Sequence, residues 1–151
     1  MTFVSKSHFF VRCKMKVWVK VLIITLLVAI PSFILGPLIW PKSPDMSPTP
    51  LQLPFFIFLS VLESLLLGLG ISFIIFGFKL LKKSNAKNNN LNILAYLSIV
   101  WLLVSWWPHD NLHAHNALDM QGLLYIEYRF HLTLIIASVI LAYYFLNVNK
   151  R

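Results

Sequence analysis

Charged side chains are scarce in this chain. Only 12% of its 151 residues are Asp, Glu, Lys or Arg, whereas a soluble domain carries about 25%. The hydrophobic share is 58% and the mean hydropathy is +0.75. This composition is atypical of a soluble domain and predicts an integral membrane protein.

Cysteine is almost absent as well. Cys13 is the only one in the sequence, so the chain cannot form an internal disulfide, and one thiol alone is a poor metal site. The sequence contains no glycine-rich phosphate-binding loop, and the segments between its apolar stretches are too short for a nucleotide-binding domain. These absences argue against an ATP-driven machine.

Four apolar stretches are long enough, or nearly so, to cross the hydrocarbon core, which takes about 20 residues. Because backbone groups in lipid must pair within their own segment, each stretch should be a helix. We expect an all-α integral membrane four-helix bundle with short connecting loops, forming a single transmembrane domain over residues 1–151. The expected helices cover about 17–40, 51–79, 91–108 and 119–147.

Two of these helices call for comment. The first follows basic residues, as a signal peptide would, but its apolar run exceeds the 7–15 residues of a signal core, so we expect a retained helix. Pro31 and Pro37 predict a kink in its second half.

The third expected helix is the shortest and is framed by Asn92 and Pro108. It crosses the bilayer only if the bilayer thins or if flanking side chains reach outward.

Basic residues fall almost entirely on one side of this arrangement, and the positive-inside rule therefore places both termini in the cytoplasm. Lys42 is the exception, and Arg129 lies within an expected helix. The segments around 41–50 and 108–122 then face the extracytoplasmic side. The eleven residues that set this orientation are Lys6, Arg12, Lys14, Lys16, Lys20, Lys79, Lys82, Lys83, Lys87, Lys150 and Arg151.

The formal net charge of +8 has a consistent explanation in this topology. Basic flanks on the cytoplasmic side attract anionic lipid headgroups. They are spread over three short segments, none of which could form a folded nucleic-acid module. We therefore expect the lipid bilayer as a partner and no nucleic acid.

Ionisable residues inside membrane helices are costly, and each is a functional hypothesis by default. Glu63 and Arg129 lie at depths where they could meet, so we expect an intramembrane ion pair between them. Glu127 and His131 are four residues apart and should share one face of the last helix. Arg129 then lies on nearly the opposite face of that helix.

Histidine and carboxylate residues gather between the third and fourth expected helices and just beyond. Imidazole and carboxylate together suit zinc, copper, iron and nickel. Neighbouring histidines in this stretch could share a face, His109 with His113 if the segment is helical and His113 with His115 if it is extended. The candidate metal ligands or orienting residues are His109, Asp110, His113, His115, Asp119, Glu127 and His131.

Two other interpretations of the same residues stay open. Asp110, Asn116 and Asp119 are good helix N-caps, with Asn116 or Asp119 starting the last helix, so the protein could be a structural or assembly subunit of a membrane complex with no metal of its own. Histidine titrates near neutral pH and Glu/His chains relay protons in membranes, which would suit a small proton-coupled transporter or a quinone site. Haem is less expected, because only His131 is clearly within a membrane helix.

The function that these residues favour is transition-metal binding on the extracytoplasmic side, with copper or zinc first and iron next. The ligand types are similar to those of outward-facing copper or zinc sites in small membrane proteins and in membrane oxidases, a similarity of residue types alone. The protein would then serve as a subunit of a membrane redox complex, with membrane-protein partners or further copies of itself. The sequence assigns no enzymatic activity.

Overall fold

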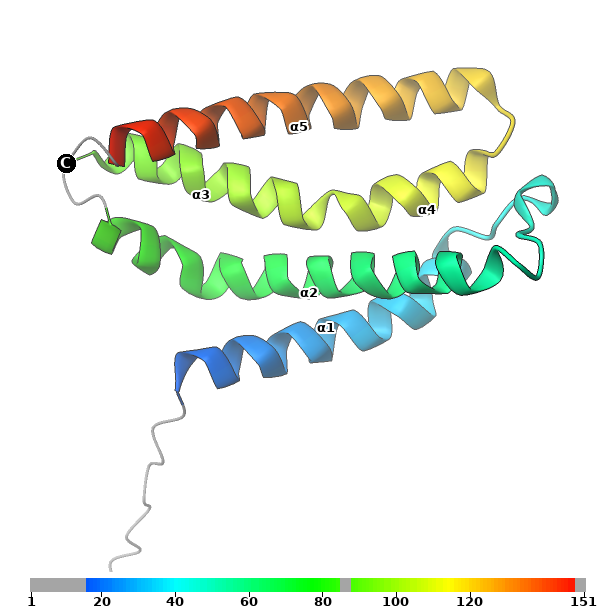
Figure 1. Cartoon of the computed structure of the whole chain (residues 1–151), viewed down its shortest axis with the longest axis horizontal. Coiled ribbons are helices and arrows are strands. Elements are labelled where there is room, and N and C mark those ends of the chain that lie inside the picture. Colours follow the sequence, from blue (N-terminus) through cyan, green and yellow to red (C-terminus); the bar gives the residue numbers. More distant parts are fainter. Residues whose placement is uncertain (1–15, 85–87, 149–151) are drawn as a thin grey trace, which may run out of the picture.

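The computed structural model describes residues 16–84 and 88–148, and Cys13 and six of the eleven orienting basic residues lie outside them. The described residues form helices and connections, without a strand (Figure 1). The elements are α1 (Val17–Ile39), the short 3-10 helix η1 (Pro44–Met46), α2 (Leu53–Ser84), α3 (Asn89–Val104), α4 (Trp106–Asn116) and α5 (Met120–Val148).

Four helical spans are long and apolar enough to cross a membrane, as a multi-pass membrane protein requires. They are α1, α2, the joined pair α3 and α4 over Asn89–Asn116, and α5. The all-α class and the number of spans predicted from the sequence are confirmed. The limits of α1, α2 and α5 also agree with the expected ones to within a few residues at most ends.

The third helix was predicted wrongly. It was expected to end near residue 108 and to lead into an extracytoplasmic loop, but after a break at Ser105 the chain continues as α4 to Asn116. Pro108 explains the break, because it lacks an N–H and its ring opposes the carbonyl one turn earlier. In the first turn of a new helix that N–H is not needed, so Pro108 is compatible with α4.

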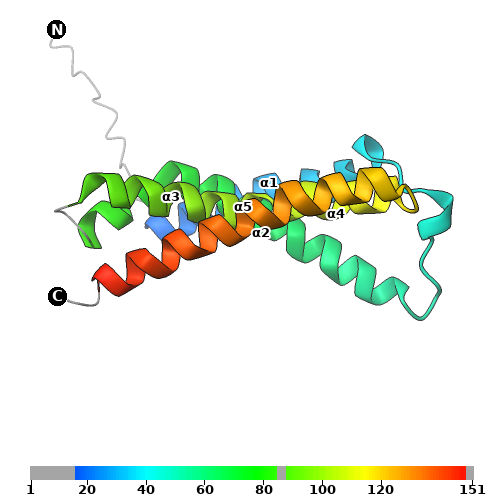
Figure 2. The same ribbon diagram turned by 90° about the horizontal axis from the view of Figure 1, so that it is seen from above.

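Consecutive spans run in opposite directions and lie side by side in chain order (Figure 1). α1 packs against α2, α2 against α3 and α4, and α3 and α4 against α5. Figure 2 shows that the first turns of α2 diverge from the other helices. α1 and α5 are therefore the two flanking helices of the bundle.

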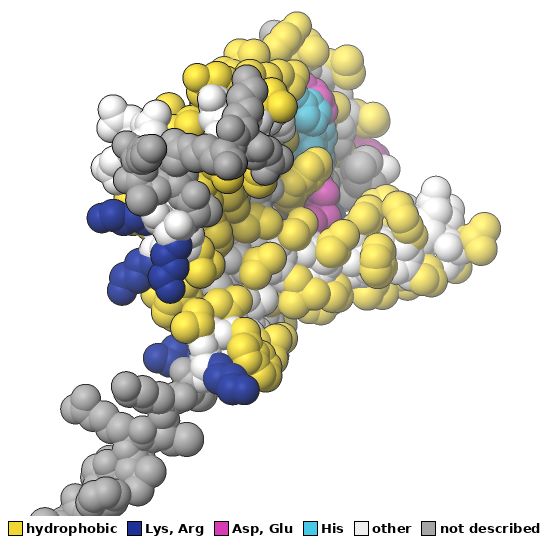
Figure 3. Space-filling view, turned by 60° about the vertical axis from the view of Figure 1, so that its left-hand side comes forward, with side chains coloured by type: hydrophobic (Ala, Val, Ile, Leu, Met, Phe, Trp, Pro, Cys, Tyr) yellow, Lys and Arg dark blue, Asp and Glu magenta, His cyan; other side chains and the backbone are white. Residues whose placement is uncertain are grey.

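The interior and the surface have the composition typical of membrane proteins. Large apolar side chains are exposed along every span, and only 11–28% of the most apolar window of each span is buried. Hydrophobic side chains dominate the face seen in Figure 3. Such a surface needs lipid around it, and small or polar residues fill the helix contacts instead. These buried residues include Thr25, Ala29, Ser32, Ser64, Ser72, Asn92, Ala95, Ser98 and Ser105.

α1 and α2 approach each other closely at Gly68. A Cβ atom added there would come within 2.3 Å of the Thr25 carbonyl oxygen, so no side chain fits. Beside this contact the hydroxyl groups of Thr25 and Ser72 are 3.1 Å apart, and Ser72 also donates to the Val21 carbonyl oxygen at 3.1 Å. The pairing of the first two helices therefore depends on a glycine and on hydroxyl hydrogen bonds.

Replacing Gly68 with valine should force α1 away from α2. Overpacking of this kind costs about 1–3 kcal/mol. We expect a correspondingly lower midpoint of SDS-induced unfolding in mild detergent for Gly68→Val, and no comparable loss for Leu69→Val on the exposed neighbouring position. Equal midpoints for the two variants would contradict the close contact.

The two ends of the bundle differ in charge. The described lysines Lys16, Lys20, Lys79, Lys82 and Lys83 gather at one end, the lysine end, visible in dark blue in Figure 3. The opposite end, the histidine end, contains α4, the start of α5 and Lys42 (Figure 1). This asymmetry is the basis of the orientation predicted from the sequence, which stays a prediction.

Candidate metal centre

α4 and α5 bring four ionisable side chains together at the histidine end. His109 and His113 are one turn apart on α4, with ring centroids separated by 4.5 Å. Glu127 and His131 are one turn apart on α5 and form an ion pair through Glu127 Oε2 and His131 Nδ1. The other Glu127 oxygen, Oε1, lies 3.1 Å from His113 Nε2. The carboxylate therefore lies between two histidines that come from different helices.

Three of these residues are arranged as metal ligands could be. One side-chain ligand atom from each of His109, His113 and Glu127 lies within 4.8 Å of the other two. A tetrahedral zinc ion with bonds of about 2.0–2.1 Å needs its ligand atoms about 3.3 Å apart. Closing around an ion would therefore take side-chain movements of about 1 Å. The fourth residue, His131, has its ring centroid 5.1 Å from that of His109.

His109 is the most deeply buried member, with 7% of its surface exposed. Its Nδ1–H donates to Asp110 Oδ1 at 2.6 Å, which leaves the lone pair of Nε2 on the other side of the ring. Nε2 is buried and has no hydrogen-bond partner among the described residues. An unpartnered buried polar atom costs about 1–3 kcal/mol, and a carboxylate behind a histidine is how metal-binding histidines are commonly oriented.

His113 resembles His109 in one respect, because its Nε2 is also buried and makes no hydrogen bond of good geometry. That atom has only the ion-pair distance to Glu127. Aromatic rings close the apolar side of the cluster, with Phe130 5.3 Å and Trp106 6.0 Å from the His109 ring centroid. The cluster therefore combines two unsatisfied imidazole nitrogens with one carboxylate in largely apolar surroundings.

The cluster lies inside the membrane-crossing part of the chain. His109 is two turns before the end of its span and His131 is three turns after the start of α5, or about 10 and 17 Å from the respective ends. Spans of this length exceed the hydrocarbon thickness of about 30 Å, so their ends project beyond it. The four side chains consequently lie within the candidate spans, in their half nearer the histidine end.

The structure does not bring every expected ligand into the cluster. His115 is exposed, and its Nδ1–H donates to the Pro41 carbonyl oxygen at 2.8 Å, so it attaches the α1–α2 connection to α4. Asp119 precedes α5 and accepts a hydrogen bond from the Gln121 backbone N–H at 3.2 Å, as an N-cap does. His113 and His115 do not share a face, because the segment is helical.

The expected pair of Glu63 and Arg129 is also not formed in the described structure. The Arg129 guanidinium lies over the Tyr125 ring, 3.4 Å from its centroid, on the exposed side of α5. Glu63 is buried in α2 and interacts with Asp110 of α4. The prediction rested on depth alone, whereas the neighbours of Glu63 depend on the arrangement of the helices, and α2 packs against α4 rather than against α5.

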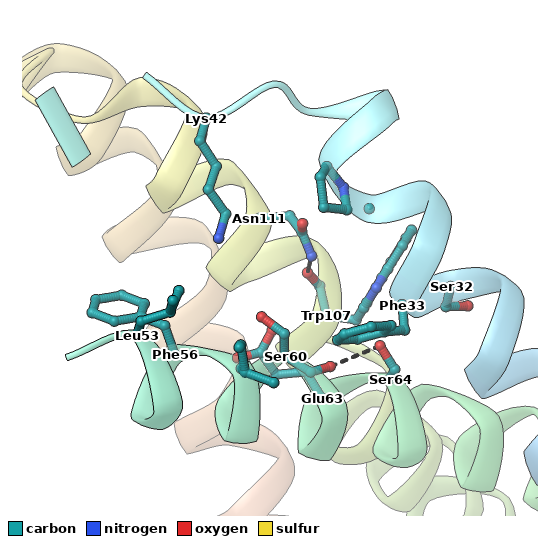
Figure 4. A pocket seen from close by; sticks show the side chains of 13 residues that line it. Ser32, Phe33, Lys42, Leu53, Phe56, Ser60, Glu63, Ser64, Trp107 and Asn111 are labelled. Carbon is teal, nitrogen blue, oxygen red and sulfur yellow. Dashed lines mark hydrogen bonds between the residues drawn. The ribbon is translucent and has the colours of Figure 1, made fainter. Parts of the chain in front are cut away.

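The contact between Glu63 and Asp110 extends the cluster toward α2. Asp110 interacts with His109 on one side and Glu63 on the other, and Lys42 is the cation that acts on Glu63. Figure 4 shows Lys42 reaching from the α1–α2 connection toward the wall that holds Glu63 and Ser60. This link was missed in the sequence because the predicted loop left Asp110 without a fixed position.

No protein-family model, curated protein or solved structure matches this chain. The function of this protein is therefore inferred from the geometry of its described residues.

The Asp110 carboxylate should fix the tautomer of His109. In metal-free protein we expect the ¹⁵N chemical shifts of this ring to show the proton on Nδ1 and the lone pair on Nε2. Asp110→Ala should weaken that preference, whereas Asp119→Ala should leave it unchanged. A proton on Nε2 in the parent protein would contradict the arrangement.

Proposed function

We propose that this protein binds a transition metal ion through His109, His113 and Glu127, in the half of the membrane that contains the histidine end. The observation that carries the proposal is the buried Nε2 of His109, which has no hydrogen-bond partner among the described residues, on a ring that offers one of three ligand atoms within 4.8 Å of one another. Asp110 orients His109, and His131 orients Glu127. A metal ion could coordinate both imidazole nitrogens that lack a hydrogen bond, those of His109 and His113.

The ligand set favours particular metals. Two histidines and one glutamate form the protein ligand set of some catalytic zinc sites, where a fourth position stays open for water or substrate. Two histidines and a carboxylate also serve non-haem iron(II), and copper(II) binds imidazole more tightly than either metal. Zinc or copper is therefore proposed first and iron next. An open fourth position suits either catalysis or transfer of the metal to a partner.

The orientation of the site follows from the positive-inside rule. With the lysine end in the cytoplasm, both termini are cytoplasmic and the metal centre lies in the extracytoplasmic half of the membrane. α5 is the least buried span, and Glu127 and His131 retain 42% and 47% side-chain exposure on it. Exposed polar groups at this depth favour a membrane-protein partner or a second copy on α5, as in a subunit of a redox complex.

Elemental analysis tests the proposal directly. Full-length protein purified in mild detergent without chelator should contain about one equivalent of zinc, copper or iron, since the three ligand atoms form one group. His109→Ala and His113→Ala should lose the metal, and His131→Phe should weaken affinity about 10–100-fold, as loss of an orienting partner does. An absorption spectrum of the same sample would reveal haem.

His115→Ala provides the matched control, because it removes a histidine from the same helix outside the cluster. It should retain the metal of the parent protein. Absence of metal from the parent after zinc, copper and iron have each been offered would refute the proposal. The exposed polar face of α5 favours one alternative, an assembly subunit that binds no metal. In that case the same variants of the cluster would lose binding of a partner chain, and the metal content would not change.

A further inference from the structure

Arg129 is a cation inside a candidate span that has no counterion among the described residues. It lies about 14 Å along α5 from Met120, the first residue of the helix. Its side chain is exposed and forms no salt bridge within the described part of the chain. Ionisable residues at such positions almost always pair with another group. Arg129 therefore requires a partner from outside this chain.

An acidic residue lies on the other edge of the same exposed face of α5. Tyr128, which is 72% exposed, marks the centre of that face. Glu127 and Arg129 flank it, each about 100° away around the helix and only about 3 Å apart along its axis. The Glu127 side chain is 42% exposed although it contacts two histidines, and a carboxylate can accept about four hydrogen bonds. This face thus has a cation on one edge and an anion on the other.

The Arg129 side chain leans toward the centre of this face. Its guanidinium lies over the Tyr125 ring, 3.4 Å from the centroid. Tyr125 is about one turn earlier in α5 and lies closer to Tyr128 around the helix than Arg129 does. The charged group is therefore displaced from its Cα atom toward the height of Glu127 and toward the middle of the exposed face.

A second copy of this chain offers the complementary edge. Copies of a membrane protein insert in one orientation, so two copies that meet through α5 are parallel and related by a two-fold axis. In a parallel helix pair each edge of the contact face meets the opposite edge of the partner, as e and g positions do in coiled coils. Arg129 of each copy then faces Glu127 of the other copy, which gives two ion pairs in one dimer.

The residues between the two edges have the spacing of a parallel helix pair. Exposed apolar side chains follow Tyr128 at intervals of four, three and four residues, at Leu132, Ile135 and Val139. Lipid is as apolar as these side chains, so they supply packing, and the ion pairs supply the preference for a protein partner. The other flanking helix, α1, exposes apolar residues but contains no acidic residue.

We propose that two copies of this protein associate through the exposed face of α5, with Arg129 of each copy paired with Glu127 of the other. Each copy thereby places a cation beside the proposed metal ligand Glu127 of its partner. The association goes beyond the proposed function and does not require a bound metal.

Energy transfer between donor- and acceptor-labelled full-length copies in liposomes tests the association, because dilution with lipid gives the dissociation constant. Arg129→Gln should raise that constant about tenfold, since two polar contacts between helices are lost in each dimer. Lys42→Gln removes the same charge from an exposed residue of the histidine end outside α5. This control should associate as the parent does.

Charge reversal identifies the partner of Arg129. Arg129→Glu alone places two acidic residues opposite each other at both contacts, and Glu127→Arg alone places two arginines there. Each variant should associate at least about tenfold more weakly than the parent. An equimolar mixture of the two variants should form mixed dimers with nearly the affinity of the parent, because every contact again joins opposite charges. Binding of Arg129 to a lipid phosphate would give no such recovery.

Cross-linking locates the contact on α5. In a Cys13→Ser background, Leu132→Cys should be joined to the same residue of the other copy by a short bis-maleimide, whereas Leu27→Cys on the exposed surface of α1 should not. A monomeric parent, parent-like association of Arg129→Gln, or no recovery in the mixture would each overturn the proposal. None of these outcomes concerns the proposed function, which the metal content of the parent protein decides separately.

Discussion

Lipid offers no hydrogen-bond partner, and this constraint organises the whole described chain. Hydroxyl and amide groups along the spans are turned into helix contacts, as Thr25 and Ser72 are between α1 and α2. Large apolar side chains cover the outside instead. The histidine end stands out against this constraint, because four ionisable side chains gather there within the candidate spans, and two of their imidazole nitrogens lack a hydrogen bond.

The break between α3 and α4 determines the geometry of that end. A straight continuation or an early loop would leave His109 and His113 in other positions, whereas the new helix that contains Pro108 places them one turn apart against α5. α5 then supplies Glu127 and His131 from a single face. Asp110, on the adjoining side of α4, connects this group to Glu63 of α2. Three spans thereby contribute to one polar network.

Much of this could be predicted from the sequence. Hydropathy gave the four spans, and helical spacing gave the pairing of Glu127 with His131 and, for a helical segment, of His109 with His113. The helical continuation through 106–116 could not be predicted, because its polar composition is typical of a loop and its stability comes from contacts with α2 and α5. The predicted pairing of Glu63 with Arg129 was wrong for a similar reason, because the partner of Glu63 depends on which helices are neighbours.

X-ray absorption at the edge of the bound metal tests the central claim most directly. The site described here predicts only nitrogen and oxygen ligands, at about 2.0–2.1 Å for zinc, with outer-shell scattering from two imidazole rings. His115→Ala should leave that spectrum unchanged, and His109→Ala should remove one imidazole or the metal altogether. A bound metal without imidazole scattering, or with sulfur in its coordination shell, would contradict a centre built from His109, His113 and Glu127.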